Sequence, residues 1–494
     1  MHTEFQQIKT MRKIILNLFL IIILLGSFLV RFYKIDNPVA DWHSWRQADT
    51  ASVTRIYTQK GIDLLHPKYH DFSYLQTGVF NPEGYRFVEF PIFNAIHASL
   101  VKVFPQYSLE KWGRLLSVIC SLVSTFLMFQ LGKRFLGKWT GLLSAGLFAF
   151  LPFNVYFSRV ILPEPMAVMF VLLSLVFFTK WFDTNKKIPI YISAIAFSLA
   201  LLVKPYAIFY GIPIFWLALV KHKYQLSEVF KNKLLWIFGL IVLIPIIAWR
   251  FWMAQFPEGI PFYKWVFNLE GIRFKPSFWR WIFGERLSEM ILGNLSLIPF
   301  VAGLISKPKK EEIGFTMSMG IAAFSYVSVI AAANVRHDYY QTLIIPSIVL
   351  IVAKGAWVLW NSKEFYQPFT KLIVLIALIG GIYFSWNNGI RDFYQINHPE
   401  ILRAGEAVDK IAAPDALVVA PYNGDTAFLY QTKRSGWPYQ GQPVEELVQL
   451  GADYYVSVNL NDPQTQDAMR KFEIPIQTDE YVIIDLNRKR MPKN

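Results

Sequence analysis

An arginine and an aspartate stand three residues apart in the segment Trp45-Arg46-Gln47-Ala48-Asp49-Thr50, which follows the first long apolar stretch of the chain. Charged side chains beside a membrane segment are costly to keep there, so they usually have a function. A carboxylate can accept a proton from a reacting hydroxyl group, and a guanidinium can bind phosphate. The segment therefore predicts chemistry at a membrane surface.

The composition is that of a membrane protein. The chain has 494 residues, of which 54% are hydrophobic and 17% charged, and its mean hydropathy is +0.33, far too apolar for an ordinary soluble protein. About 20 apolar residues cross the hydrocarbon core, and we expect about eleven such spans in a mainly α polytopic fold. They are residues 14–30, 112–130, 139–153, 162–178, 190–203, 207–220, 234–249, 290–305, 315–333, 343–358 and 372–384.

Lysine and arginine collect in alternate loops, beginning before the first span, and short basic loops stay in the cytoplasm. We therefore expect a multi-pass protein of the inner membrane, with a cytoplasmic amino terminus and a retained first span. The net charge of +14 reflects topology and contact with anionic membrane lipids, and it requires no nucleic acid. Cys120 is the single cysteine, so an internal disulfide is excluded.

This topology predicts two domains. Residues 1–390 form a transmembrane catalytic domain whose first outer loop, 31–111, is large, and 391–494 form a small extracytoplasmic α/β domain. In the tail, the apolar runs 416–420, 454–458 and 481–484 predict strands, and 404–411 and 444–450 predict helices. Within the first outer loop, Pro91–Val103 is apolar but short, which favours an interfacial or re-entrant segment.

Ionisable residues gather on the expected outer side, next to apolar spans. They are Asp41, Arg46, Asp49, Arg55, Glu89, Arg159, Glu164, Lys204, Arg336, His337 and Asp338. If the spans form a bundle, these residues share one surface, where carboxylates lie beside cations. Such a surface would bind an anion.

Outside the cytoplasm ATP and nucleotide sugars are absent, so a donor must arrive through the membrane. A sugar linked through phosphate to a polyprenyl chain would place its tail between spans and its phosphate against lysine and arginine. A neighbouring carboxylate could deprotonate an acceptor hydroxyl as it attacks the anomeric carbon. The sequence therefore predicts transfer of a sugar from a polyprenyl-phosphate donor.

Several motifs, taken in order, resemble the GT-C membrane glycosyltransferases, in particular bacterial relatives of the protein O-mannosyltransferases and of the aminoarabinose transferases of lipid A. The motifs are 45–50 with Arg55, Glu89-Phe90-Pro91, Gly113-Arg114-Leu115, Ser158-Arg159, Pro163-Glu164-Pro165, Lys204-Pro205 and Arg336-His337-Asp338-Tyr339-Tyr340. The resemblance covers roughly residues 11–386.

The resemblance implies roles for individual residues. Asp49 is the expected base, and Glu164 takes the second acidic position, which orients the acceptor. Lys204 and Arg336 match basic positions near the lipid phosphate, and we place Arg159 on the same side. Arg46, Arg55, His337 and Tyr340 belong to the motifs as further candidate site residues. Glu89 matches a glutamate that can bind a divalent metal ion, but relatives often carry a basic residue where this chain has Phe90.

Simpler interpretations exist for the same residues. Asp49 could cap a helix that starts after it, and Glu164 could be an ordinary acid at a helix start. Asp41, near Trp42 and Trp45, suits an interfacial turn. Arg159 and Lys204 could extend to lipid headgroups at the ends of spans.

Other functions are also open. The chain has no Walker loop, no dinucleotide-binding glycine motif and no Cys-x-x-Cys pair, so an ATP-driven pump is disfavoured. A transporter or flippase of lipid-linked sugars would place charges near the bilayer midplane, and an inert membrane scaffold would not need Asp49 with Glu164. We therefore expect an inverting glycosyltransferase of the cell envelope, acting on a glycolipid, polysaccharide or protein acceptor outside the cytoplasm.

Overall fold

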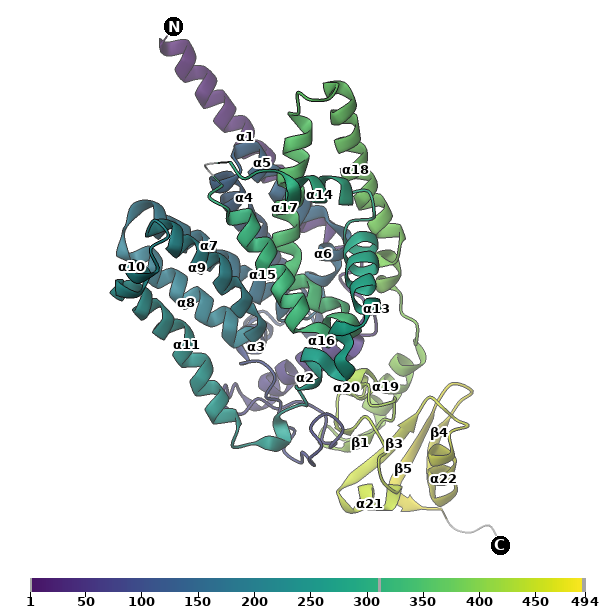
Figure 1. Ribbon diagram of the computed structural model, residues 1–494. Coiled ribbons are helices and arrows are strands. Elements are labelled where there is room, and N and C mark those ends of the chain that lie inside the picture. Colours follow the sequence, from purple (N-terminus) through teal and green to yellow (C-terminus); the bar gives the residue numbers. More distant parts are fainter. Residues whose placement is uncertain (1, 310–311, 491–494) are drawn as a thin grey trace. The chain divides into compact units, whose positions relative to one another are not determined.

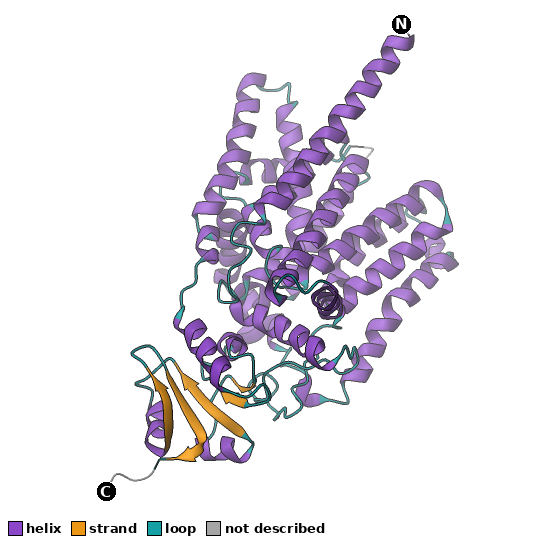
Figure 2. Ribbon diagram, turned by 180° about the vertical axis from the view of Figure 1, so that it is seen from behind, coloured by secondary structure: helices purple, strands orange, loops and turns teal. Residues whose placement is uncertain are grey.

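The computed structural model describes residues 2–309 and 312–490, and it is mainly helical with one small sheet near the carboxyl end (Figures 1 and 2). The chain divides into two compact units. Unit 1 comprises the residues up to 35, 114–249 and 263–393, and unit 2 comprises 36–113, 250–262 and the residues from 394 onward. The first outer loop thus belongs to the same unit as the tail. The predicted domain boundary near 391 stays a prediction, and residues 1, 310–311 and 491–494 of the two predicted domains lie outside the described residues.

Unit 1 consists of helices, with the first residues of α4 and the last of α11 in unit 2. Its α-helices are α1 (His2–Val30), α4 (Leu109–Phe135), α5 (Lys138–Phe150), α6 (Pro152–Phe157), α7 (Glu164–Thr184), α8 (Lys187–Val203), α9 (Gly211–Lys221), α10 (Leu226–Lys231), α11 (Lys233–Met253), α12 (Trp265–Asn268), α13 (Pro276–Trp279), α14 (Leu297–Ile305), α15 (Phe315–Val329), α16 (Ala331–Arg336), α17 (Ile345–Trp360) and α18 (Gln367–Asn387). Shorter 3₁₀ segments are η1 (Pro205–Tyr210), η3 (Leu269–Phe274), η5 (Asp338–Ile344) and η6 (Ile390–Tyr394), and η4 (Arg280–Ile291) is a π-helix.

Each predicted span coincides with helical structure. Among the described residues, six helices are long and apolar enough to cross a membrane: α1, α4, α7, α11, η5 with α17, and α18. Others are shorter, and the span expected at 290–305 is broken after η4, where Gly293 and Asn294 adopt left-handed backbone angles. The chain is a multi-pass membrane protein, while the count of eleven spans stays a prediction.

The spans differ in how much of them is buried. In the helix formed by η5 and α17, 83% of the apolar window is buried, against 17% in α1 and in α11. A helix that is apolar all round belongs in the interior, and exposed apolar helices suit a lipid environment. α14 packs so closely on α17 that only glycine fits at position 355. A Cβ atom on Gly355 would lie 1.8 Å from the carbonyl oxygen of Pro299.

Unit 2 combines the first outer loop with the tail. Its elements outside the sheet are α2 (Ser44–Lys60), α3 (Ile92–Val103), η2 (Pro257–Gly259), α19 (Glu400–Ile411), α20 (Thr426–Gln431), α21 (Val444–Gln449) and α22 (Pro463–Lys471). The strands are β1 (Leu417–Val419), β2 (Ser435–Trp437), β3 (Ala452–Ser457), β4 (Phe472–Gln477) and β5 (Val482–Lys489). The strands form one sheet, drawn in orange in Figure 2. Their order is β2-β1-β3-β5-β4, with β2, β1 and β3 parallel and β5 antiparallel to both neighbours.

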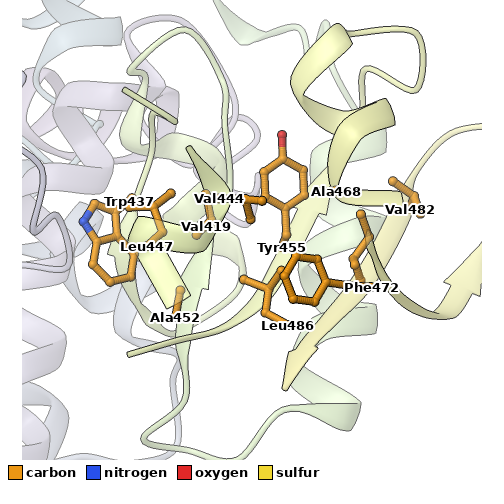
Figure 3. Packing of buried hydrophobic residues seen from close by; sticks show 11 residues of the cluster. Val419, Trp437, Val444, Leu447, Ala452, Tyr455, Ala468, Phe472, Val482 and Leu486 are labelled. Atoms are coloured by element: carbon orange, nitrogen blue, oxygen red, sulfur yellow. The ribbon is translucent and has the colours of Figure 1, made fainter. Parts of the chain in front are cut away.

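The tail contains the sheet and a buried hydrophobic core, on which Phe72 of the first outer loop also packs. Figure 3 shows Tyr455, Phe472 and Leu486 packed together, and Trp437 with Leu447 belongs to the same buried cluster. The predicted strands at 416–420, 454–458 and 481–484 are observed as β1, β3 and β5, and the two predicted helices as α19 and α21.

The first outer loop pairs with the edge of this sheet. Phe72 donates its backbone N–H to the carbonyl of Gly436 in β2 (2.8 Å), and Gly436 donates to the carbonyl of His70 (2.9 Å). Gly436 has a φ of 147°, and a Cβ atom there would lie 2.0 Å from the carbonyl oxygen of Val418. Only glycine fits this position, which joins the loop to the domain.

Candidate functional site

Asp49 lies in the second turn of α2, a helix whose residues from Arg46 to Tyr57 are all buried although many are polar. Its side chain is 1% exposed. Oδ2 is 2.5 Å from Nη2 of Arg86, and Oδ1 accepts a hydrogen bond from the Thr426 hydroxyl at 2.7 Å. A carboxylate has about four acceptor positions, so two such contacts leave capacity for a substrate hydroxyl. Because α2 begins at Ser44, the interpretation of Asp49 as a helix cap was wrong.

Arg86, in the loop between α2 and α3, is the counter-ion of Asp49. Its side chain is buried, also donates to the amide oxygen of Gln76, and stacks over the ring of Tyr69 with 4.8 Å between the guanidinium carbon and the ring centre. These contacts fix the guanidinium in place. The carboxylate of Asp49 is therefore held in a defined position.

Two further acids, the buried Asp71 and the partly buried Asp425, interact electrostatically with Asp49. Asp71 accepts a hydrogen bond from the Ser73 N–H at 2.7 Å, and burial together with the charge of Asp49 raises its pKa to about 7. Asp425 caps α20 through the Ala427 N–H, and burial with the same charge raises its pKa to about 6. Both carboxyl groups hold their protons more tightly than in water.

The raised pKa of Asp71 predicts a pH-dependent gain in stability for Asp71→Asn. Between about pH 4 and pH 7 native Asp71 keeps a proton that the unfolded chain has lost, so its burial penalty grows with rising pH and is complete above pH 7. The variant removes this penalty, and we expect its thermal unfolding midpoint in detergent to exceed the wild-type value clearly at pH 8 and little at pH 5. Asp63→Asn, which changes an exposed acid, is the control. Equal shifts at both pH values would contradict the prediction.

The other two candidate residues of α2, Arg46 and Arg55, make ion pairs. Arg46 pairs with Glu89, and Gln47 donates to Asp41 at 2.6 Å. Arg55 donates to the carbonyl of Tyr430 at 2.8 Å, covers its ring with 3.8 Å to the ring centre, and pairs with Glu110. Arg55 therefore fastens α2 to α20.

The surroundings of Glu89 do not fit a metal site. Its carboxylate faces the guanidinium of Arg46, which competes with any cation for the same oxygen. In the part of the chain that the structure describes, no group of three or more histidine, cysteine, aspartate or glutamate residues is placed to hold a metal ion. We assign no chemical step to a metal.

In unit 1, Glu164 and Lys204 form a buried ion pair. Glu164 is the first residue of α7 and Lys204 lies just before η1, and Nζ is 2.5 Å from Oε1. Oε2 of Glu164 is buried without a hydrogen-bond partner among the described residues. Glu164 does start a helix, as the simpler interpretation held, but Lys204 is buried, which does not suit an ammonium group extended to headgroups.

The motif 336–340 lies around Lys204. Nζ of Lys204 is 5.1 Å from the ring centre of Tyr340 and 5.7 Å from that of Tyr339, and His337 stacks on both rings. The guanidinium of Arg336 lies over the ring of Trp265. The structure thus brings Glu164, Lys204, His337 and Tyr340 together.

Arg159 lies in a different buried environment. It is fully buried, donates to the carbonyl of Lys34, and its guanidinium faces the ring of Tyr156. A second buried arginine, Arg31, donates to Ser158 at 2.8 Å. Burial excludes Arg159 from the headgroup contact that we considered, and its place beside the donor phosphate stays a prediction.

An apolar cavity of about 430 Å³ opens between η4, α14, α15 and α17. Most of its lining is aliphatic or aromatic, and the two cations among the described lining residues are Arg286 and Lys354. Arg286 pairs with Asp338 at 2.6 Å, and Lys354 with Glu312 at 3.1 Å. A molecule with a long hydrocarbon chain and an anionic end fits such a lining.

Comparisons with known proteins concern the fold of the chain. A family model described as dolichyl-phosphate-mannose-protein mannosyltransferase matches residues 90–252, and no curated protein matches the sequence. The structure of ArnT from Cupriavidus metallidurans bound to undecaprenyl phosphate superposes with a TM-score of 0.64 at 13% identity, covering 94% of this chain and 97% of that one. The chain has the GT-C glycosyltransferase fold.

Two other GT-C structures are similar. The oligosaccharyltransferase of Archaeoglobus fulgidus, in complex with Zn and sulfate, has a TM-score of 0.58 at 12% identity, covering 90% of this chain and 68% of that one. The mycobacterial arabinofuranosyltransferase AftD has a TM-score of 0.54 at 14% identity, covering 94% of this chain and 41% of that one. At such identities the likeness concerns the fold.

Three residues of the described sites were missed from the sequence: Arg86, Thr426 and Arg286. Arg86 sits in a polar loop without an apolar span beside it, and Thr426 is an uncharged residue of the tail. Arg286 lies in the segment 251–289, whose four tryptophans and several cations are typical of membrane anchoring and also suit the lining of a donor entrance. That Asp49, in unit 2, shares a cavity with Glu164, Lys204 and Arg336, in unit 1, stays a prediction.

Proposed function

We propose that this protein is a glycosyltransferase that moves a sugar from a polyprenyl-phosphate donor to an acceptor hydroxyl on the extracytoplasmic side of the inner membrane. The apolar cavity carries the proposal, because it combines a hydrocarbon lining with Arg286 next to the 336–340 motif. The GT-C fold supports it, since a protein of that fold is known with undecaprenyl phosphate bound. The alternating basic loops support a cytoplasmic amino terminus and an outer tail domain.

In the proposed reaction, Asp49 is the general base. The acceptor oxygen forms a bond to the anomeric carbon while its proton passes to the Asp49 carboxylate. The bond from that carbon to the donor phosphate oxygen breaks, and its electron pair stays on the polyprenyl phosphate. Direct displacement from the opposite face inverts the anomeric configuration.

The other residues handle charge and position. Lys204, Arg336 and Arg159 neutralise the phosphate as it gains charge in the transition state. The unpartnered Oε2 of Glu164 accepts a hydrogen bond from the sugar acceptor, while Oε1 stays on Lys204. Cations placed in advance in a buried site stabilise the departing phosphate more than water would.

The hydroxyl of Thr426 positions the base. Thr426 belongs to the tail, and its hydroxyl donates a hydrogen bond of 2.7 Å to Oδ1 of Asp49. The same hydroxyl also lies 3.2 Å from the carbonyl oxygen of Trp45. We expect Thr426→Val to lower kcat about tenfold with KM little changed, because one hydrogen bond to a charged group is lost, and Thr426→Ser to keep near-normal activity. Thr465→Val removes another buried hydroxyl, one that bonds Ser457, and is the control. An unchanged kcat in Thr426→Val with Asp49 essential would show that Thr426 has no positioning role.

Binding of undecaprenyl phosphate to the purified protein tests the donor site. We expect the lipid to raise the thermal unfolding midpoint by several degrees, because a ligand bound to the native state stabilises it. Ala323→Trp, at a lining position of the apolar cavity, should abolish the shift, and Ser325→Trp on the same helix α15 should keep it. Absence of a shift in the wild type, or an equal shift in Ala323→Trp, would remove the cavity as the donor site. Movement of lipid-linked sugar across vesicles without acceptor would instead support a flippase.

A further inference from the structure

A second pocket of unit 1, of about 400 Å³, is lined by the end of α4, the start of α5, residues that follow α14, and α17. Among the described residues, five cations line it, against one carboxylate, Glu312. The cations are Lys133, Arg134, Lys307, Lys309 and Lys354. We call it the basic pocket.

The positive charge of the basic pocket is only partly balanced. Arg134 makes two bonds of 2.7 and 2.8 Å to Asp183, and Lys354 pairs with Glu312. The remaining three lysines give the lining an excess of positive charge. Like charges that converge on one pocket repel each other, so an anion bound among them would stabilise the protein.

Backbone groups and a hydroxyl point to the same kind of ligand. Gly137, the residue just before α5, lines the pocket and has a φ of 99°. It provides no side chain that could cap the first N–H groups of α5. The first N–H groups of a helix lack partners within it and attract anions. Thr140, which also lines the pocket, is 1% exposed, and its Oγ1 has no hydrogen-bond partner among the described residues. An oxyanion would satisfy these donors.

The remaining lining is apolar and comes from Phe135, Leu136, Trp357 and Val358. A free inorganic anion gains nothing from such side chains, whereas the glycerol and first methylenes of a lipid do. The pocket also lies where the apolar helix α4 ends, which is the depth of headgroups for a membrane span. We propose that the basic pocket binds the phosphate of an anionic phospholipid. This proposal does not depend on the glycosyl-transfer reaction.

Native mass spectrometry of the full-length protein, exchanged from detergent into phosphatidylglycerol or phosphatidylcholine, tests the proposal. We expect phosphatidylglycerol to bind selectively, and Lys307→Gln/Lys309→Gln to weaken its binding about thirtyfold, since each basic residue contributes roughly a fivefold effect near a lipid surface. Thr140→Val should weaken binding a fewfold through the loss of one hydrogen bond.

Matched variants separate this site from general charge and packing effects. Lys363→Gln/Lys371→Gln removes two lysines that do not line the pocket, and Thr125→Val removes a hydroxyl that bonds its own helix; both should bind phosphatidylglycerol as the wild type does. Equal binding of the two lipids, equal loss in the control lysine variant, or full displacement of the lipid by millimolar inorganic phosphate would overturn the proposal.

Discussion

Asp49→Asn is expected to lower sugar transfer by about 10³-fold, because general-base catalysis contributes roughly 10²- to 10⁴-fold and asparagine cannot accept the proton. The amide keeps the size of the side chain and an oxygen that can accept the Thr426 hydrogen bond. The variant is expressed in a strain that lacks the chromosomal gene. Transfer is then measured by mass spectrometry of the glycans in the cell envelope of that strain.

The unfolding shift caused by undecaprenyl phosphate serves as the control for Asp49→Asn, and it should remain. Asp63→Asn, at an exposed acid that contacts His66, should transfer normally. Normal turnover by Asp49→Asn would remove Asp49 as the base.

Breaking the Glu164–Lys204 pair is expected to have the second largest effect. In Lys204→Met the Glu164 carboxylate stays buried without its counter-ion, and loss of one partner of a buried pair typically costs about 3–5 kcal/mol. We expect a lower thermal unfolding midpoint in detergent and loss of transfer by at least about 10²-fold.

The double variant Lys204→Met/Glu164→Leu separates stability from function. Replacing both partners of a buried pair by apolar side chains is often neutral or stabilising, so the unfolding midpoint should recover. Transfer should not recover, because the phosphate loses a cation and the acceptor loses a carboxylate. If transfer returned together with stability, the pair would have a structural role only.

The membrane helices were predictable because hydropathy over about 20 residues carries a strong signal. Local backbone features were not. The predicted span 290–305 is interrupted at Gly293 and Asn294, two left-handed residues that an apolar average does not reveal. In the tail, β2 has three residues, too few for alternation to show, and β4 contains a proline, so both strands were missed.

The roles of the candidate site residues stay predictions, but the signal that selected them is clear: charge that stands out against apolar sequence. Glu164 and Lys204 were selected for that reason, and they form a buried pair. Arg55 was selected in the same way, yet it fastens α2 to α20. The partners of Asp49 were out of reach, since Arg86 follows it by 37 residues and Thr426 by 377, and only the fold reveals such contacts.

The pairing of the first outer loop with β2 has a consequence for biogenesis. Gly436 joins the sheet to residues 70–72, so α2 reaches its native surroundings only after most of the polypeptide has left the ribosome. A nascent chain that carries the early helices alone would hold Asp49 without Thr426 and the rest of its native surroundings. Under the proposed function, premature termination anywhere before β2 would yield an inserted but inactive product, whatever the integrity of its amino-terminal portion.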